Sequence, residues 1–404
     1  MGTMITLGIG KMELDWGKNN IFKDHSKLFQ IDDIKLIPYY YVDSDTDEDI
    51  TKMKEGYAKK LSSIKKRLDL LGYSLTGVES MYNSYMNELE LHEIAFNMPF
   101  SLFKEAIYNI SVSDFNTVEI EKEHFGYEFD FGEYARKCIM NLPQMKNIFL
   151  DVDNEYDLSS FLENLDCYLL IRLLAENPLN ADYELHWGFA DIIESGWVQK
   201  EDILKTLPAE DKILIVTEGS SDSFIIERTI KELYPDIADF FEFVDMEENY
   251  PFTGVGNLYN FFLGLVRIKV QNQVIILFDN DIAGIEKHSL ALAIDTPSNF
   301  LVCKLPYDTE LEHIQTCGPS GKNNENINDK AVAIECFLDF KSVSDIPCIR
   351  WTTYSKKINA YQGELLAKDK YVRAFKKATL TDLTYDTRKL RKLIDYLILS
   401  WLEK

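Results

Sequence analysis

Apolar and polar residues follow two different patterns in the first half of the chain. Residues 4–16 and 34–42 alternate between them and are rich in aromatic and β-branched side chains, which is typical of strands. The charged residues 43–49 predict a hairpin tip between the second of these strands and residues 50–56. Three later segments carry apolar residues three or four positions apart, the spacing of a helix. They are residues 57–73, 80–96 and 158–178. We therefore expect residues 1–205 to form a mixed, largely helical domain.

The pattern changes at Asp211. Continuous apolar runs, of the kind that are buried on both faces of a parallel sheet, now alternate with amphipathic segments. The expected strands are residues 212–219, 240–246, 273–281 and 300–306. The expected helices are residues 221–234, 258–270 and about 284–293. This alternation is typical of βαβ units, so the predicted fold class is α/β with a mainly parallel sheet.

The last part of the chain is expected to be loop and helix. The pattern predicts a polar loop at residues 318–330 and a short helix at residues 331–340. Two amphipathic segments, residues 361–378 and 384–404, predict closing helices. No low-complexity linker separates these parts, so the joints between domains must be tight. The expected domains are residues 1–205, residues 206–345 and a basic helical C-terminal extension, residues 346–404.

Carboxylates follow two of the predicted parallel strands. Glu218 comes after the first strand, and Asp279 and Asp281 end the third. Because chemistry in such sheets collects outside the carboxyl ends of the strands, we expect these side chains to meet there, with Glu335 joining them from a later helix. Carboxylates that converge repel one another unless protons or a cation neutralise them. Oxygen ligands favour Mg²⁺ or Mn²⁺ over zinc.

Each of these acids also has a plainer interpretation. Asp279 and Asp281 are suited to capping the following helix, although the presence of Glu218 favours the metal site. Asp222 is either a metal carboxylate or a helix cap. Glu335 is either a metal ligand or an ordinary acid on the surface of a helix. Nearby, the two glycines of residues 253–257 either bring backbone amides to a phosphate or form a simple turn.

Composition narrows the classes of partner. A formal net charge of −24 argues against a surface that binds nucleic acid everywhere, although the segment from Arg350 onward is basic. That segment is either a nucleic-acid groove or a helix pair that neutralises acidic neighbours. No apolar stretch is long enough to span a bilayer, and the N-terminus is unlike a signal peptide, so we expect a cytoplasmic protein. The six cysteines form no CxxC pair, which indicates buried reduced thiols rather than disulfides or a zinc site.

The acidic motifs also resemble a known family. "ILIVTEGSSDSFII" (residues 213–226) and "VIILFDNDIAG" (residues 274–284) resemble the Toprim domain, which is shared by bacterial primases, topoisomerases and overcoming-lysogenization-defect (OLD) nucleases. The resemblance implies a Rossmann-like fold with a mainly parallel sheet. It also implies that Glu218 is a general acid/base or metal ligand, and that Asp279 and Asp281 are magnesium ligands.

Two further segments resemble the OLD nucleases in particular. "AVAIECFLDF" (residues 331–340) is similar to their downstream Ile-Glu motif, which implies Glu335 as a ligand of a second metal. "YQGELLAKDKYVRAF" (residues 361–375) is similar to their C-terminal segment, which implies that Lys368 stabilises the charge of the reacting phosphate. Lys368 also lies in a lysine-rich helix, where a solvated charge is the plainer interpretation. No GxxxxGK[ST] motif is present, unlike in full OLD proteins.

The N-terminal segment "LGIGKMELDWGKNNIFKDHSKLF" (residues 7–29) resembles the N-terminal domain of bacterial HEPN/Toprim proteins, which act in conflict with phage. It implies a sensor, scaffold or partner-binding domain. Together the resemblances imply a magnesium-dependent nuclease in antiphage defence, with DNA or structured RNA such as tRNA as substrate, and with a defence-system protein or a second copy of the chain as further partner. The alternative is a non-cleaving Toprim module that binds nucleic acid or a partner protein.

Overall fold

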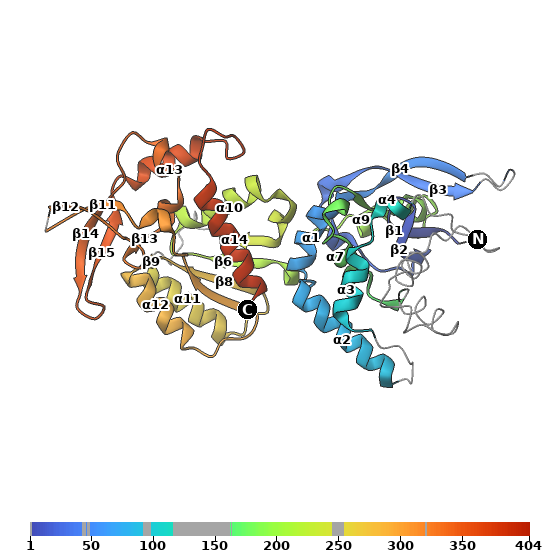
Figure 1. Cartoon of the computed structure of the whole chain (residues 1–404), viewed down its shortest axis with the longest axis horizontal. Helices are drawn as coiled ribbons and strands as arrows, with labels where there is room; N and C mark the ends of the chain where they lie inside the picture. Colours follow the sequence, from blue (N-terminus) through green and yellow to red (C-terminus); the bar gives the residue numbers. More distant parts are fainter. Residues whose placement is uncertain are drawn as a thin grey trace. The chain divides into compact units, whose positions relative to one another are not determined.

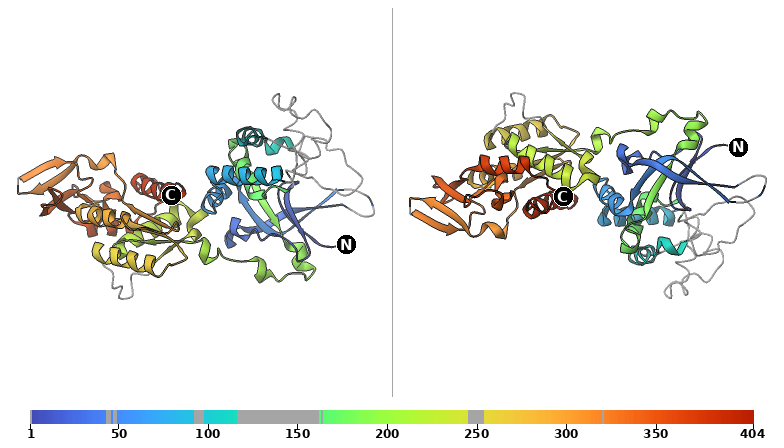
Figure 2. Two further views of the ribbon diagram at one scale, coloured as in Figure 1. Left: turned by 90° about the horizontal axis from the view of Figure 1, so that it is seen from below. Right: turned by 90° about the horizontal axis from the view of Figure 1, so that it is seen from above.

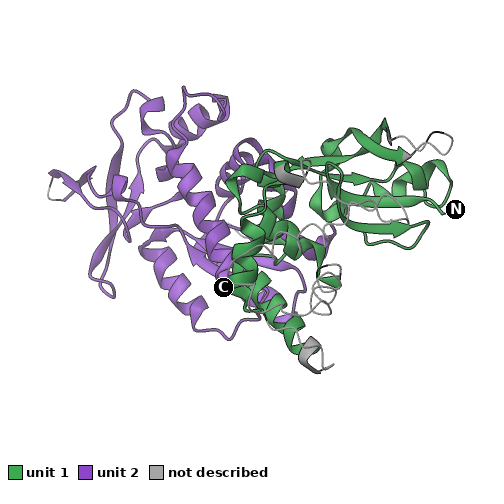
Figure 3. Cartoon of the chain, turned by 45° about the vertical axis from the view of Figure 1, so that its right-hand side comes forward, with its two compact units in different colours: residues 1–207 green, residues 208–404 purple. Residues whose placement is uncertain are grey.

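The computed structural model describes residues 2–42, 46, 49–91, 98–115, 162, 164–244, 254–319 and 321–404 (Figure 1). The chain forms two compact units, Met1–Leu207 and Pro208–Lys404 (Figure 3). Each unit has its own sheets and helices, so the mixed α/β character that the patterns predict is confirmed. No helix within the described part of the chain is long and apolar enough to cross a membrane.

The first unit is built on a five-stranded antiparallel sheet with the order β2-β1-β5-β4-β3. Its strands are β1 (Met4–Ile9), β2 (Met12–Lys18), β3 (Ile34–Val42), β4 (Asp49–Lys60) and β5 (Glu184–Gly188). The pairing of β3 with β4 confirms the hairpin strands, whose predicted tip lies mostly outside the described residues. The fifth strand lies in a part of the domain that was expected to be largely helical and where the sequence pattern predicts no strand. It forms because Trp187 pairs across the sheet with Tyr57, ring stacked on ring, a contact between distant parts of the sequence.

Helices cover one face of this sheet (Figure 2). They are α1 (Leu61–Leu70), α2 (Leu75–Leu91), α3 (Phe100–Tyr108) and α7 (Cys167–Leu174). Shorter helices are α4 (Val112–Phe115), α8 (Ala190–Glu194) and α9 (Lys200–Ile203), with 3₁₀ turns at Ser26–Leu28, Ile31–Asp33 and Pro178–Asn180. Residues 57–60 belong to β4 rather than to the predicted helix, because Ala58 and Lys59 pair with His186 and Leu185 in β5.

The second unit contains a parallel sheet with the order β10-β8-β6-β7. Its strands are β6 (Ile213–Val216), β7 (Phe241–Phe243), β8 (Gln273–Phe278) and β10 (Phe300–Lys304). The residues of β8 from Val274 to Phe278 are all buried, as a continuous apolar run predicts. The helices α11 (Val255–Arg267) and α12 (Ile282–Leu292) lie together on one face, and α10 (Ser220–Leu233) and α14 (Arg388–Leu402) lie on the other (Figure 1).

A second sheet in this unit corrects three expectations. Its order is β12-β11-β14-β15, with strands β11 (Ile314–Gly318), β12 (Gly321–Glu325), β14 (Cys348–Ser355) and β15 (Ala360–Leu365). The expected polar loop is therefore partly a hairpin strand, and the C-terminal extension begins with strands rather than helices. The expected short helix at residues 331–340 consists of β13 (Ala331–Val332) and 3₁₀ turns at Ile334–Phe337 and Phe340–Ser342.

Gly363 shows why the extension starts as a strand. A side chain there would overlap Ile349, Ala331 and Trp351, which pack directly on its backbone. Glycine is a poor helix former and permits this close approach between strands. The helix α13 (Lys368–Lys377) begins only after Ala367, whose φ of 55° interrupts the strand. The remaining 3₁₀ turns are Ala209–Asp211, Pro235–Phe240 and Thr309–Leu311.

Candidate functional site

Glu218 lies just beyond the carboxyl end of β6. Its Oε1 accepts a hydrogen bond of 3.1 Å from the backbone N–H of Asp279, which follows β8. Its own backbone carbonyl accepts a hydrogen bond of 3.0 Å from Gly254, which precedes α11. Gly254 has a φ of 89°, a conformation that favours glycine, so this glycine has a structural use in the turn. Glu218 is thus held from three segments of the chain.

Asp222 lies in the first turn of α10. Its Oδ2 accepts a hydrogen bond of 3.0 Å from the backbone N–H of Gly219, and its Oδ1 accepts one of 3.2 Å from the hydroxyl of Ser221. Asp222 therefore caps the helix from its third position, with Gly219 rather than Asp222 as the N-cap residue. Each carboxylate oxygen still has lone pairs beyond these contacts, so capping does not rule out a ligand role.

The two aspartates after β8 differ in their partners. Asp281 caps α12, because its Oδ1 accepts a hydrogen bond of 2.7 Å from Gly284 N–H, and its Oδ2 accepts one from the side-chain amide of Gln362. No donor among the described residues contacts the carboxylate of Asp279. Between the two, Asn280 is fully buried and accepts a hydrogen bond of 2.8 Å from Lys304. The helix-cap interpretation thus applies to Asp281 and not to Asp279.

Gly284 brings α12 against the aspartates. A Cβ at this position would lie 2.2 Å from the carbonyl oxygen of Asp279, far inside van der Waals contact. Any larger residue has to push the backbone of Asp279 away. The glycine that follows the two aspartates is therefore required by packing.

Glu335 is brought to the same place by a short strand pair. Ala331 and Val332 in β13 pair antiparallel with Asp281 and Asn280, which form β9 (Asn280–Asp281). Glu335 follows in a 3₁₀ turn and is only 4% exposed, so the expectation of a surface acid on a helix is wrong. The ammonium of Lys368, at the start of α13, lies 3.9 Å from Glu335 Oε1 with most of its side chain in solvent.

The electrostatics of these acids show that they act on one another. We refer to Glu218, Asp222, Asp279, Asp281 and Glu335 as the carboxylate cluster. Burial, reinforced by the charges of neighbouring acids, raises the pKa of Glu218 and of Asp222 to about 7. The same causes, burial first, raise the pKa of Asp279 well above its usual range. Burial also raises the pKa of Asp281, although its hydrogen bonds from Gly284 and Gln362 oppose the shift.

The geometry of the cluster is open. Glu218, Asp222, Asp279 and Asp281 are each only partly buried, so solvent reaches them. Within the described residues, no three of the five carboxylates have oxygens that all lie within 4.8 Å of one another. Repulsion between like charges favours this spacing, and a cation bound by three of them has to draw them closer. All five offer oxygen, the donor type that hard divalent cations prefer.

Comparison with known families concerns the first half of the chain. Residues 1–211 match the family HEPN/Toprim N-terminal domain 1. The chain belongs to this family. The match supports the association with HEPN/Toprim proteins that residues 7–29 suggest. No curated protein and no solved structure matches the chain.

Two polar contacts of this HEPN/Toprim family member are not predicted by the sequence. Gln362 reaches Asp281 from β15, and Lys304 reaches Asn280 from the end of β10. Lys304 lies near the carboxyl end of a predicted strand of the same sheet, so its position could have indicated this contact. Gln362 had no such signal, because its segment was expected to be helical.

Proposed function

We propose that this HEPN/Toprim family member is a Mg²⁺-dependent nuclease with an OLD-like Toprim centre. Its substrate would be the phosphodiester backbone of DNA or of structured RNA such as tRNA. Its biological role would be antiphage defence. One observation carries the proposal: five carboxylates gather beside the carboxyl ends of parallel strands, where burial and the charges of neighbouring acids raise the pKa of Glu218, Asp222 and Asp279. Acids arranged at such a cost in repulsion are typical of functional sites.

The residues fit the cation chemically. Asp279 and Asp281 would hold a first Mg²⁺ or Mn²⁺ together with Glu218, and Asp222 and Glu335 are the candidates for a second. When bound, the cation polarises the phosphodiester and lowers the pKa of a water molecule. We assign this centre to a Toprim domain over residues 206–345 and a sensing or partner-binding role to residues 1–205.

The protein groups around the centre would transfer the proton, orient a ligand and stabilise the charge of the phosphate. If Glu218 is not itself a ligand, its raised pKa, about 7 in the absence of a cation, suits it to accept a proton from the attacking water and return it to the leaving oxygen. Gln362 and the N–H of Gly284 fix both oxygens of Asp281, which orients that carboxylate. Lys368 places a positive charge at the rim, beside Glu335, where it can pair with the charge of a reacting phosphate.

The test is cleavage by the purified full chain. Plasmid DNA and tRNA are incubated with the protein in Mg²⁺, Mn²⁺ or EDTA. We expect cutting that needs the cation and that falls by about a hundredfold or more in the Asp279→Ala plus Asp281→Ala variant. Asp295→Ala serves as the matched control, because Asp295 is an exposed aspartate outside the cluster. Undiminished cleavage by the double variant would overturn the proposal.

A second candidate is a binding module that does not cut. The wide spacing of the carboxylates and the net charge of −24 favour it. Expression of the wild-type chain and of Glu218→Ala in cells, with and without phage, separates the two functions. A nuclease loses its toxicity or protection with this substitution, whereas a binding module keeps both.

A further inference from the structure

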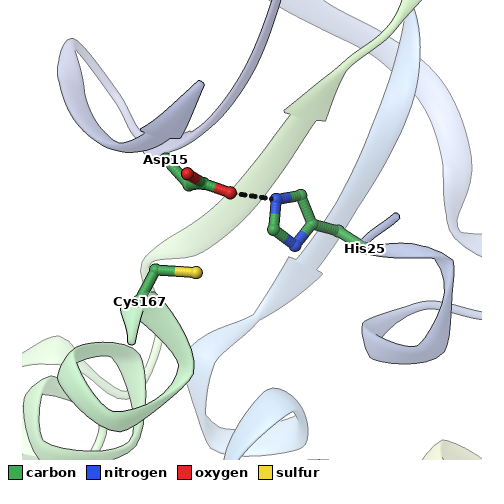
Figure 4. Close-up of side chains that lie close together, drawn as sticks. All are labelled: Asp15, His25 and Cys167. Carbon is green, nitrogen blue, oxygen red and sulfur yellow. Dashed lines mark hydrogen bonds and ion pairs between the residues drawn. The ribbon is translucent and has the colours of Figure 1, made fainter. Parts of the chain in front are cut away.

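Three side chains of different chemistry converge in the first unit, far in the sequence from the acids of the carboxylate cluster. They are Asp15 on β2, His25 before the first 3₁₀ turn, and Cys167, the first residue of α7 (Figure 4). One carboxylate oxygen, one imidazole nitrogen and the thiol sulfur all lie within 4.8 Å of one another. Among the described residues, no other group of three such ligands meets this distance.

The packing holds these side chains in place. His25 Nε2 lies 2.8 Å from Asp15 Oδ2, and His25 Nδ1 lies 3.1 Å from the hydroxyl of Tyr168. The ring of Trp187 stands edge-on to the imidazole at 5.5 Å. His25 is 3% exposed and Cys167 is 5% exposed, whereas the side chain of Asp15 is 30% exposed. The site is therefore enclosed on most sides and opens to solvent beside the carboxylate.

We propose that Asp15, His25 and Cys167 bind a Zn²⁺ ion. Zinc accepts thiolate, imidazole and carboxylate together, whereas Mg²⁺ prefers oxygen alone. Zinc bonds of about 2.0 to 2.3 Å place tetrahedral ligands roughly 3 to 4 Å apart, so a small contraction suffices. With an ion on Nε2 in place of a proton, Nδ1–H would donate to the hydroxyl of Tyr168, which lies 3.1 Å away, and this contact would fix the ring.

The charges around the site suit a bound cation. A thiolate and a carboxylate together balance Zn²⁺. The neighbouring ammonium of Lys23 lies 3.8 Å from the sulfur of Cys167 and is itself paired with Asp166 at 2.9 Å. Lys23 can therefore donate a hydrogen bond to the ligating sulfur without adding net charge to the surroundings. The sequence predicts buried reduced thiols rather than a zinc site, and the proposal departs from that prediction at Cys167, where a buried thiol lies beside two other possible ligands.

The alternative of a reactive cysteine fits less well. Burial raises the pKa of the Cys167 thiol to about 12, even beside Lys23, so without a cation the sulfur is protonated and a poor nucleophile. Without an ion, His25 Nε2 contacts Asp15 and Nδ1 contacts Tyr168, so neither nitrogen is placed to take a proton from the thiol. A bound ion would instead connect β2 to α7, which are far apart in the sequence, and stabilise the folded unit.

The experiment uses the full-length chain and metal alone. The protein is treated with chelator, given Zn²⁺ or Co²⁺, and passed over a desalting column. We expect about one zinc per chain by mass spectrometry, and with cobalt a thiolate-to-metal charge-transfer band in the near ultraviolet. Cys167→Ala should lose the band and the zinc.

Two other cysteines provide matched controls. Cys336 is buried near the acids of the second unit, and Cys317 lies beside the thiol of Cys348, so each lies where another side chain able to bind a metal is close to a thiol. Cys336→Ala and Cys317→Ala should both keep the band. Absence of the band in the wild-type chain overturns the proposal, as does a band that survives Cys167→Ala or disappears in either control.

A second variant, with a side chain of almost the same shape as the original, tests the proposal even if Cys167→Ala does not fold. Asp15→Asn keeps a hydrogen-bonding partner for His25 but removes the anionic ligand. We expect its affinity for zinc to fall at least about tenfold while its circular dichroism stays that of the wild type. Wild-type affinity in Asp15→Asn means that the three side chains form a hydrogen-bonded network only, and contradicts the proposal.

Discussion

Each unit of the chain contains a cluster of ionisable side chains, and the two clusters differ in composition and in how their charges are compensated. The carboxylate cluster of the second unit contains one kind of group, is partly open to solvent, and raises its own pKa values by burial and repulsion. The Asp15, His25 and Cys167 cluster of the first unit combines three kinds of group, of which His25 and Asp15 are joined by a hydrogen bond. The difference shows that the first cluster has hydrogen-bonding partners within the protein even when no cation is bound, whereas the repulsion within the second is relieved only by protons or a cation.

The largest expected effect follows from neutralising the least satisfied acid. Asp279→Asn should reduce cleavage by about a hundredfold or more, because it removes a charged ligand. The same substitution should raise the free energy of unfolding in EDTA by about 1 kcal/mol, because it removes a repelling charge. Cleavage assays and urea unfolding test the two halves, with Asp295→Asn as control. A variant that is both active and less stable contradicts the description of the cluster.

The opposite result is expected in the first unit. His25→Ala removes a buried ring with partners at both nitrogens, so it should lower the free energy of unfolding by about 2 to 4 kcal/mol. Unfolding followed by circular dichroism measures the loss. His313→Ala, which alters an exposed histidine, should change stability little. If His25→Ala leaves the free energy of unfolding unchanged, the hydrogen bonds of His25 do not stabilise the first unit, and the contrast between the two clusters fails.

An intermediate effect is expected at Gln362. Gln362→Leu removes the hydrogen bond that orients Asp281 and should weaken Mg²⁺ binding about tenfold, with the fold intact. Calorimetric titration with Mg²⁺ measures the affinity. The matched control is Gln315→Leu, because Gln315 is a half-buried glutamine of the same sheet, on β11, outside the cluster. Equal affinity in Gln362→Leu and the wild type would show that Asp281 needs no such support.

The smallest effect is a dependence of stability on pH. The folded-state pKa of Glu218 and of Asp222 is about 7, above the usual value of about 4 in an unfolded chain, so folded protein binds more protons between these values. In EDTA, stability should therefore fall as pH rises from about 4 to about 7, by on the order of 1 kcal/mol after solvent screening. Thermal unfolding at several pH values measures the slope, and Mg²⁺ should reduce it. A stability that rises over this interval contradicts the assigned repulsion.

The parts of the fold that the sequence predicts best are those set by local pattern. The continuous apolar runs of β6 and β8 predict parallel strands, and because parallel strands end at one sheet edge, Glu218 and Asp279 were expected to meet. Their backbone-to-carboxylate hydrogen bond agrees with that expectation.

The parts that were missed depend on contacts between distant segments. The strand β15 is specified by pairing with β14, which overrides the helical spacing of residues 361–378, and Gln362 could not be assigned without it. Glu335 was equally open to a surface position until the pairing of β13 with β9 placed it. Asp15 and Cys167 lie too far apart in the sequence for any short spacing to reveal their approach.

Anomalous diffraction from crystals soaked in Mn²⁺ tests the central claim most directly, because it locates the ion without requiring a substrate. The account predicts a manganese peak bonded to Asp279 and Asp281, with Glu218 beside it and the carboxylates drawn together around it. No peak within the carboxylate cluster, or a manganese peak found at Asp15, His25 and Cys167 instead, would contradict it.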